Sequence, residues 1–160
     1  MLFSCPPYFD LEVYSDLPND ASNQGTYDDF LKILDNAFTN AVKCLKYNRF
    51  AVIVVGDIRD KNGFYYDFVS DIKQIFRKAG MHLYNEAILV DPLSNKRIAA
   101  NRHMKTRKLM KTHQNVLVFY KGDTQAIKDN FTPIDLSEAE INKILLDYEG
   151  GNEDDSTDME

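Results

Sequence analysis

The chain of 160 residues carries a formal net charge of -6, and 44% of its residues are hydrophobic. This length suits one domain with a substantial core and excludes a large multidomain enzyme. The hydrophobic residues fall in clusters separated by polar turns, which excludes a mostly disordered chain.

The negative charge is concentrated at the end of the chain. From Asp147 onward there are seven acids and no Lys or Arg, so the residues before Asp147 sum to +1. We therefore expect a folded domain over residues 1–148 and a disordered acidic tail over residues 149–160. The acidic balance belongs to the tail and does not exclude an anionic partner for the folded domain.

Other composition features favour a cytoplasmic domain. Cys5 and Cys44 make no disulfide framework, and no charged segment followed by an apolar one marks a leader. The longest apolar run, residues 50–55, is far below the roughly 20 residues of a membrane span, so no membrane partner is expected. The three histidines lack the spacing of zinc or iron ligands, and no metal site is predicted.

The first half of the chain predicts a strand, a loop, a helix and a second strand. A short strand over residues 1–4 ends at Pro6-Pro7, because neither proline can donate to a sheet ladder. Residues 9–25 carry turn chemistry and predict a long loop with local helix. Residues 26–47 follow with an N-cap and helical spacing, and the unalternating run 50–55 predicts a strand covered on both faces.

The second half continues this alternation. A helix over residues 65–79 precedes strands over 83–90 and 116–120, with a polar insertion at 92–115 between the two strands. A capping box predicts a last short helix over residues 137–148. We expect an α/β fold with a sheet of about four strands and helices on both faces, mostly parallel because helical crossovers force it. The last strand has no helical crossover and is expected to be antiparallel.

A Pro-Pro-aromatic triplet follows the first strand directly. Cys5-Pro6-Pro7-Tyr8 lies where ligands of open α/β sheets bind, beyond the carboxyl ends of the strands. The prolines hold backbone carbonyls in one direction, and Tyr8 offers a flat face on which a base can stack. The alternative is a rigid strand exit with a surface tyrosine.

Gly56-Asp57 ends the second strand and is expected at the same edge of the sheet. Asp57 either accepts a hydrogen bond from a ligand or pairs only with Arg59.

The insertion between the last two strands is strongly basic. It holds seven positive charges with no acid among them, and His103 and Asn101 lie between them. Such a segment is either a solvated face or a nucleic-acid contact that neutralises phosphates and brings polar side chains to the bases. The seven residues are Lys96, Arg97, Arg102, Lys105, Arg107, Lys108 and Lys111.

Four ordered blocks together resemble the catalytic half of the amino-group DNA methyltransferases, whose sheet is Rossmann-like. These blocks are residues 3–16, 49–63, 84–90 and 111–123. The similarity is greatest to the DNA modification methylases of phages and prophages. It implies methyl transfer from S-adenosylmethionine to the exocyclic amine of adenine or cytosine in DNA, and a bacterial host cell.

The resemblance assigns Cys5-Pro6-Pro7-Tyr8 to the family's catalytic motif. Cys5 and the Pro6 carbonyl would receive the target amine and contact the cofactor, and Tyr8 would stack on the flipped base, with Asp57 lining the base pocket. The base must leave the helix stack because its amine cannot be reached there. The sequence departs from the family pattern at Cys5, because a thiol is a weak acceptor.

A second departure is larger, since no Gly-x-Gly occurs in the chain. The family's main cofactor loop is therefore missing, and we expect the cofactor half on a separate chain, docked at the free edge of the first strand. Self-association through that edge is the other expectation. The alternative function is a catalytically dead methyltransferase remnant that binds nucleic acid through its basic insertion.

Overall fold

A computed structural model of the chain describes residues 1–91, 103–134, 137, 141 and 142. The chain divides into two compact units, Met1–Thr124 and Gln125–Glu160. Among the described helices, none has the length and apolar character needed to cross a membrane. The main elements of the first unit are β1 (Leu2–Ser4), η1 (Ala21–Asn23), α1 (Tyr27–Cys44), β2 (Arg49–Val55), α2 (Phe68–Lys78), β3 (His82–Val90) and β4 (His113–Lys121).

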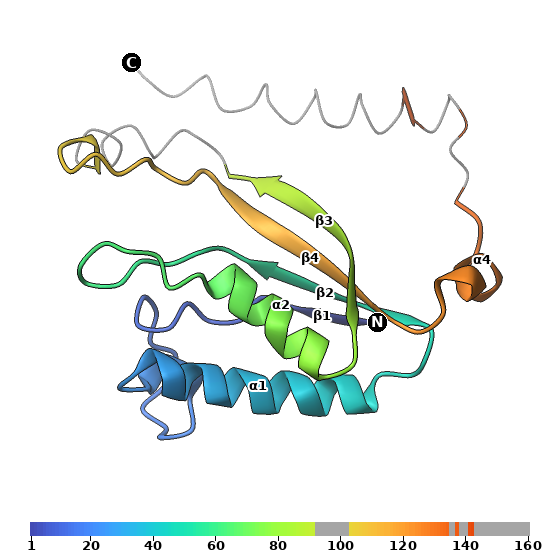
Figure 1. Ribbon diagram of the computed structural model, residues 1–160, viewed down its shortest axis with the longest axis horizontal. Helices are drawn as coiled ribbons and strands as arrows, with labels where there is room; N and C mark the ends of the chain where they lie inside the picture. Colours follow the sequence, from blue (N-terminus) through green and yellow to red (C-terminus); the bar gives the residue numbers. More distant parts are fainter. Residues whose placement is uncertain (92–102, 135–136, 138–140, 143–160) are drawn as a thin grey trace, which may run out of the picture. The chain divides into compact units, whose positions relative to one another are not determined.

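The four strands form one mixed sheet in the order β1-β2-β4-β3 (Figure 1). β1 pairs with β2 in parallel, and β4 runs antiparallel to both β2 and β3. The predicted α/β fold, the four strands and the antiparallel last strand are confirmed. β4 inserts between β2 and β3, so β1 and β2 are the single hydrogen-bonded parallel pair in this sheet.

Both helices of the first unit lie on the same face of the sheet, whereas the sequence predicted helices on both faces. The crossovers from β1 to β2 and from β2 to β3 proceed in the same direction across the sheet, and right-handed connections then place both helices on one side. α1 and α2 contact each other there. Among the described residues of this unit, α-helices cover one face of the sheet, so the prediction of helical cover is confirmed for that face alone.

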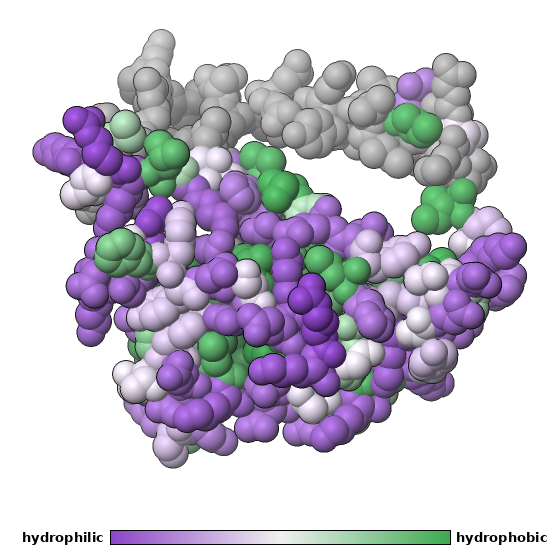
Figure 2. Space-filling model, in the orientation of Figure 1, coloured by the Kyte–Doolittle hydropathy of each residue, from purple (hydrophilic) through white to green (hydrophobic). Residues whose placement is uncertain are grey.

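The core lies between this helical layer and the sheet. The side chains of β2 and β4 that face the helices are Ala51, Ile53, Val55, Leu117 and Phe119, all fully buried. They pack against apolar residues at helical spacing on the inner faces of α1 and α2, led by Phe30, Phe68 and Phe76. The outer surface of the helical layer is mostly hydrophilic in Figure 2, as amphipathic helices require.

The two helices are shorter than predicted, for local reasons. The Thr26 side chain accepts a hydrogen bond from the Asp29 N–H, so the start of α1 is as expected. α1 ends at Cys44 because the extended Leu45 leaves the helix. α2 begins at Phe68 because the preceding residues, 58–66, form a small hairpin closed by an Arg59–Tyr65 bridge.

The second unit contains the short helix α4 (Ile127–Asn130), preceded by the 3-10 turn η2 (Thr124–Ala126) that begins at the end of the first unit. In the predicted last helix, the Ile141 N–H donates to the Ser137 carbonyl over 3.0 Å. Residues 138–140 and 143–148 of that predicted helix, and the acidic tail, lie outside the described residues.

Candidate functional site

Three segments meet at the carboxyl edge of the sheet. β1 and β2 both end there, and β4 begins there because it runs the opposite way, with Asn115 opposite Val55. The loop after β1, the residues after β2 and the first residues of β4 therefore share one edge. This is the edge at which open α/β sheets bind ligands.

Tyr8 is held at this edge by two contacts. Its hydroxyl donates to Gln114 Oε1 over 2.8 Å, and its ring meets Phe68 edge to face, with the centroids 6.4 Å apart. Burial raises the pKa of the Tyr8 hydroxyl, so the group stays protonated and donates at neutral pH. Gly56 passes beside the ring, since a Cβ there would lie 3.6 Å from the Tyr8 Oη. The ring is thus fixed in orientation before any ligand binds.

The loop that carries Tyr8 is anchored by the next residue. Phe9 has a positive φ of 47° and is buried, and its ring packs against Tyr27, Phe30 and Tyr66. The Leu11 N–H also donates to the Tyr8 carbonyl over 3.0 Å, which closes a turn. A bulky residue with positive φ is strained, and its burial in an aromatic cluster stabilises the turn.

An ion pair with Arg59 was one of the two roles predicted for Asp57. The structure instead gives Asp57 other partners. One carboxylate oxygen accepts a hydrogen bond from the Val69 N–H in the first turn of α2, over 3.0 Å. The other lies 3.5 Å from Lys111 Nζ. Arg59 instead donates to the Gly63 carbonyl over 2.7 Å and lies over the Tyr65 ring. Asp57 thus satisfies one free N–H of α2 and holds Lys111 at the edge of the sheet.

These side chains surround two adjoining pockets. One, of about 260 Å³, contains Tyr8, and the other, of about 390 Å³, contains Tyr65. Asp57, Lys111 and His113 line both pockets. The first is also lined by Leu11, Gly56, Ile58 and Gln114, and the second by Leu109 and Met110.

The basic residues of the insertion occupy three kinds of position. Lys105 and Arg107 are exposed on a turn over residues 103–108, which lies at the same end of the sheet (Figure 1). Lys108 lies close to Gly63, because a Cβ added to Gly63 would stand 2.5 Å from the Lys108 Nζ. Lys111 lies between Asp57 and Asn115. The other three, Lys96, Arg97 and Arg102, lie outside the described residues. The predicted insertion of residues 92–115 ends earlier than expected, because β4 begins at His113.

Cys5 and Pro6 were predicted to contact the cofactor. Cys5 is exposed and Pro6 is buried at the end of β1, and neither residue lines the pockets of Tyr8 and Tyr65. In the described part of the chain, the residues predicted to hold S-adenosylmethionine therefore form no enclosing cradle. By themselves they do not fit the whole cofactor.

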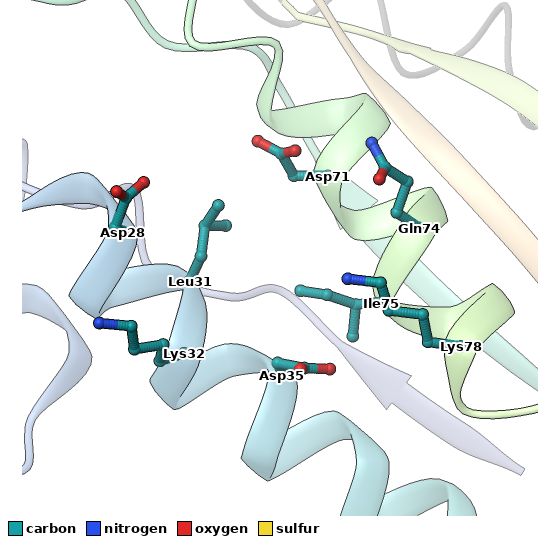
Figure 3. Close-up of a pocket in the computed structure, with 8 residues that line it drawn as sticks. All are labelled: Asp28, Leu31, Lys32, Asp35, Asp71, Gln74, Ile75 and Lys78. Atoms are coloured by element: carbon teal, nitrogen blue, oxygen red, sulfur yellow. The ribbon is translucent and has the colours of Figure 1, made fainter.

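Another pocket, of about 200 Å³, lies between α1 and α2 on the outer surface of the helical layer (Figure 3). Leu31 of α1 and Ile75 of α2 point into the space between the helices, surrounded by three acids and two lysines. It is separate from the carboxyl edge of the sheet and contains none of the residues predicted to act. We interpret it as a groove between two packed helices.

The fold was compared with solved structures. Three structures of a presumed DNA modification methylase from Thermus thermophilus are similar. The selenomethionine form gives a TM-score of 0.55 at 18% identity, a second form 0.53 at 20%, and the complex with S-adenosyl-L-methionine 0.52 at 17%. The chain has a methyltransferase-like fold.

The similarity covers 87% of this chain but only 49% or 50% of those proteins, so the chain spans about half their length. A scan against protein-family models and a search of curated proteins both give no match. At these identities the similarity concerns the fold, and the residues of the site stand on their own geometry.

Gln114, His113 and Phe9 contribute to the site and were not predicted from the sequence. Gln114 and His113 lie at the edge because an antiparallel β4 begins where β1 and β2 end. The sequence does contain a signal for these two residues. The polar run 113–115 directly precedes the apolar part of a strand predicted to be antiparallel, which places the run at the edge where the parallel strands end. Phe9 was also missed, because no local pattern marks a buried ring at a positive φ.

Proposed function

We propose that the chain is the catalytic and target-recognition half of a DNA methyltransferase. It would act on the exocyclic amino group of adenine or cytosine, with S-adenosylmethionine supplying the methyl group. One observation carries the proposal. The Tyr8 ring is fixed at the carboxyl edge of a methyltransferase-like sheet, beside a pocket that also contains Asp57 and Lys111.

The residues have distinct roles in this proposal. The Tyr8 ring is proposed to stack on the flipped base. Cys5 and the Pro6 carbonyl, which precede Tyr8 but lie outside the lining of its pocket, would receive the amine. Stacking on an aromatic ring is worth about 1–3 kcal/mol per base. Asp57 lines the pocket and keeps Lys111 in place. Lys105, Arg107 and Lys108 neutralise phosphates of the DNA, and Lys96, Arg97 and Arg102 are proposed to do the same.

The cofactor half is proposed to come from a separate chain, because the described residues of the site form no enclosing cradle for S-adenosylmethionine. β1 is the edge strand of the described sheet, and Phe3 on it is 61% exposed, which suits a docking edge. Self-association through that edge is the competing assembly. We propose a bacterial cytoplasmic setting of phage or prophage origin.

Calorimetry tests the need for a partner. The purified chain alone is expected to show no measurable binding of S-adenosylmethionine. Micromolar affinity of the isolated chain would contradict the requirement for a second chain.

Methyl transfer tests the site. The purified chain is mixed with labelled S-adenosylmethionine, DNA and a candidate partner encoded by an adjacent reading frame with a Gly-rich motif. Transfer is expected only with the partner, and Tyr8→Ala should lower it roughly 5- to 100-fold through lost stacking. Tyr47→Ala is the matched control, since Tyr47 lies in the turn before β2, at the opposite end of that strand. Equal transfer by the Tyr8→Ala and Tyr47→Ala variants would contradict the proposed role of Tyr8.

A second candidate function is favoured by Cys5, whose thiol is a weak acceptor at the position that receives the amine. In this case the chain is a catalytically dead remnant that binds nucleic acid through its basic residues. The triple variant Lys105→Gln, Arg107→Gln, Lys108→Gln should then abolish DNA binding, while Tyr8→Ala leaves it unchanged. A charge-matched triple variant at Lys32, Lys43 and Lys46, all exposed on or just after α1, is the control. Loss of binding in the Tyr8→Ala variant would contradict this alternative.

A further inference from the structure

A groove lies between the hairpin 58–66 and the chain that leads into β4. The hairpin is closed by the Asp60 N–H to the Phe64 carbonyl over 2.8 Å and by the Tyr66 N–H to the Ile58 carbonyl over 3.1 Å. The end of the Lys108 side chain lies close to Gly63, so the two walls approach each other there. The groove contains the 390 Å³ pocket and continues into the Tyr8 pocket through shared residues.

The aromatic wall of this pocket is pre-oriented. Arg59 lies over the Tyr65 ring, with its Cζ 3.8 Å from the ring centroid, and is itself held by the Gly63 carbonyl. Tyr65 is nevertheless 48% exposed, so much of its surface faces solvent. An aromatic ring with a guanidinium on one face and exposed surface elsewhere is a stacking platform.

The rest of the pocket matches a nucleotide. Leu109, 76% exposed, and Met110 provide apolar surface, while Lys111 and His113 lie on the side toward Tyr8. The Asp57 carboxylate also lines the pocket, but its charge is opposed by Lys111 at 3.5 Å. A flat base can lie on the aromatic and apolar wall while its phosphate meets Lys111. The volume falls within the range of about 300–1,000 Å³ that is usual for ligand pockets.

We propose that this pocket is a second base-binding subsite, which holds the nucleotide next to the target base in the same DNA strand. Tyr65 stacks on that neighbouring base, and Arg59 supports the ring from behind. The subsite rests on the proposed function, because the adjoining Tyr8 pocket would hold the target base. Because stacking accepts any base, the subsite adds affinity for the strand and not selectivity for one neighbouring base.

The chain contains no tryptophan, which allows a direct test. Three single variants, Tyr65→Trp, Tyr8→Trp and Tyr47→Trp, each place one fluorescent reporter in the protein. Each is titrated with a short single-stranded oligodeoxynucleotide at low ionic strength, after circular dichroism has shown that it is folded. Stacking of a base quenches indole fluorescence. We expect quenching in the first two variants and none in Tyr47→Trp, whose side chain is 66% exposed at the other end of β2.

The outcomes separate the two proposals. Quenching of the Tyr8→Trp reporter alone overturns the subsite and leaves the base pocket of the proposed function in place. Quenching of the Tyr65→Trp reporter alone supports nucleotide binding in the groove and contradicts the base pocket. No quenching in either variant overturns both.

Affinity provides a second measurement that needs no tryptophan. By fluorescence anisotropy of the same oligonucleotide, Tyr65→Ala should weaken binding roughly 5- to 100-fold, and Tyr65→Phe should weaken it far less, because the ring is retained. Tyr47→Ala is expected to bind like the wild type. Equal affinities for the Tyr65→Ala variant and the wild type would overturn the subsite.

Discussion

The side chains at the two ends of strand β2 bind different kinds of partner. At the amino end, Lys121 Nζ donates to the Val42 and Leu45 carbonyls over 2.6 and 2.7 Å, and the Asn48 N–H donates to the Lys121 carbonyl over 2.7 Å. Asn48 Oδ1 accepts from the Asp123 N–H. Side chains at this end bind main-chain groups and join α1 to the sheet.

At the carboxyl end, side chains also bind one another, and they do so around open space. Tyr8 donates to Gln114, and Asp57 faces Lys111, beside two pockets. The difference indicates a division of labour in which the amino end contributes stability and the carboxyl end presents chemistry. Substitutions at the amino end should therefore change the free energy of unfolding, and those at the carboxyl end mainly ligand binding.

The largest expected effect is at Gly122. Its φ of 150° is rarely adopted by other residues, and a Cβ there would lie 2.9 Å from the Asn48 Cα. Gly122→Ala should lower the free energy of unfolding by about 3 kcal/mol, measured by urea denaturation. Gly25→Ala is the control, because a Cβ there meets nothing within 4 Å. A loss at Gly122 no larger than at Gly25 would show that this turn does not hold the amino end together.

Lys121→Met comes next. The substitution removes the charged donor from the Val42 carbonyl in α1 and from the carbonyl of its C-cap, Leu45, at the helix end where a positive charge is also favoured. We expect a loss of about 1–3 kcal/mol in the free energy of unfolding. Lys43→Met, at an exposed position in the last turn of α1, should change it by less than about 0.5 kcal/mol. Similar losses for the two variants would remove the distinction between the ends.

These contacts also show what the sequence can predict. Apolar runs and caps indicated four strands and two helices, because each depends on neighbouring residues. The role of Lys121 depends on carbonyls 76 and 79 residues earlier in the chain. A basic residue at a strand end carries no local mark of such a contact.

The candidate site was predictable to the same extent. Tyr8 and Asp57 follow strands directly, and the order of elements places them at one edge. The placement of β4 between β2 and β3 is a property of the whole sheet, and it brings Gln114 and Lys111 to that edge. The partner of Asp57 therefore could not be predicted from its neighbour Arg59.

A smaller effect is expected at Asp57, at the carboxyl end. The N-cap residue of α2, Asp67, makes no side-chain cap, so Asp57 supplies the acceptor for the Val69 N–H. Asp57→Ala should cost about 1 kcal/mol of unfolding free energy, whereas Asp57→Asn retains an acceptor and should cost less. Urea denaturation of both variants measures the difference. Equal losses would mean that the charge facing Lys111, and not the cap, is what stabilises this end.

The smallest effect belongs to a contact midway along the sheet. Glu86 on β3 accepts from Lys73 on α2 over 2.9 Å and from Asn115 over 2.9 Å. The bond from Lys73 lowers the pKa of the Glu86 carboxyl below its ordinary 4.5. A lowered carboxyl pKa adds stability above the unfolded value, and that stability is lost as the pH falls through the folded value.

Because both side chains are partly exposed, Glu86→Gln should cost only about 0.5 kcal/mol at neutral pH. The gap between variant and wild type should be narrower at about pH 3, below the ordinary carboxyl pKa of 4.5, because protonation of the folded carboxylate removes its stabilising contribution. Urea midpoints at the two pH values provide the measurement, with Glu12→Gln on the exposed loop as the control. A gap that stays constant with pH would show that Glu86 acts through packing and not through its charge.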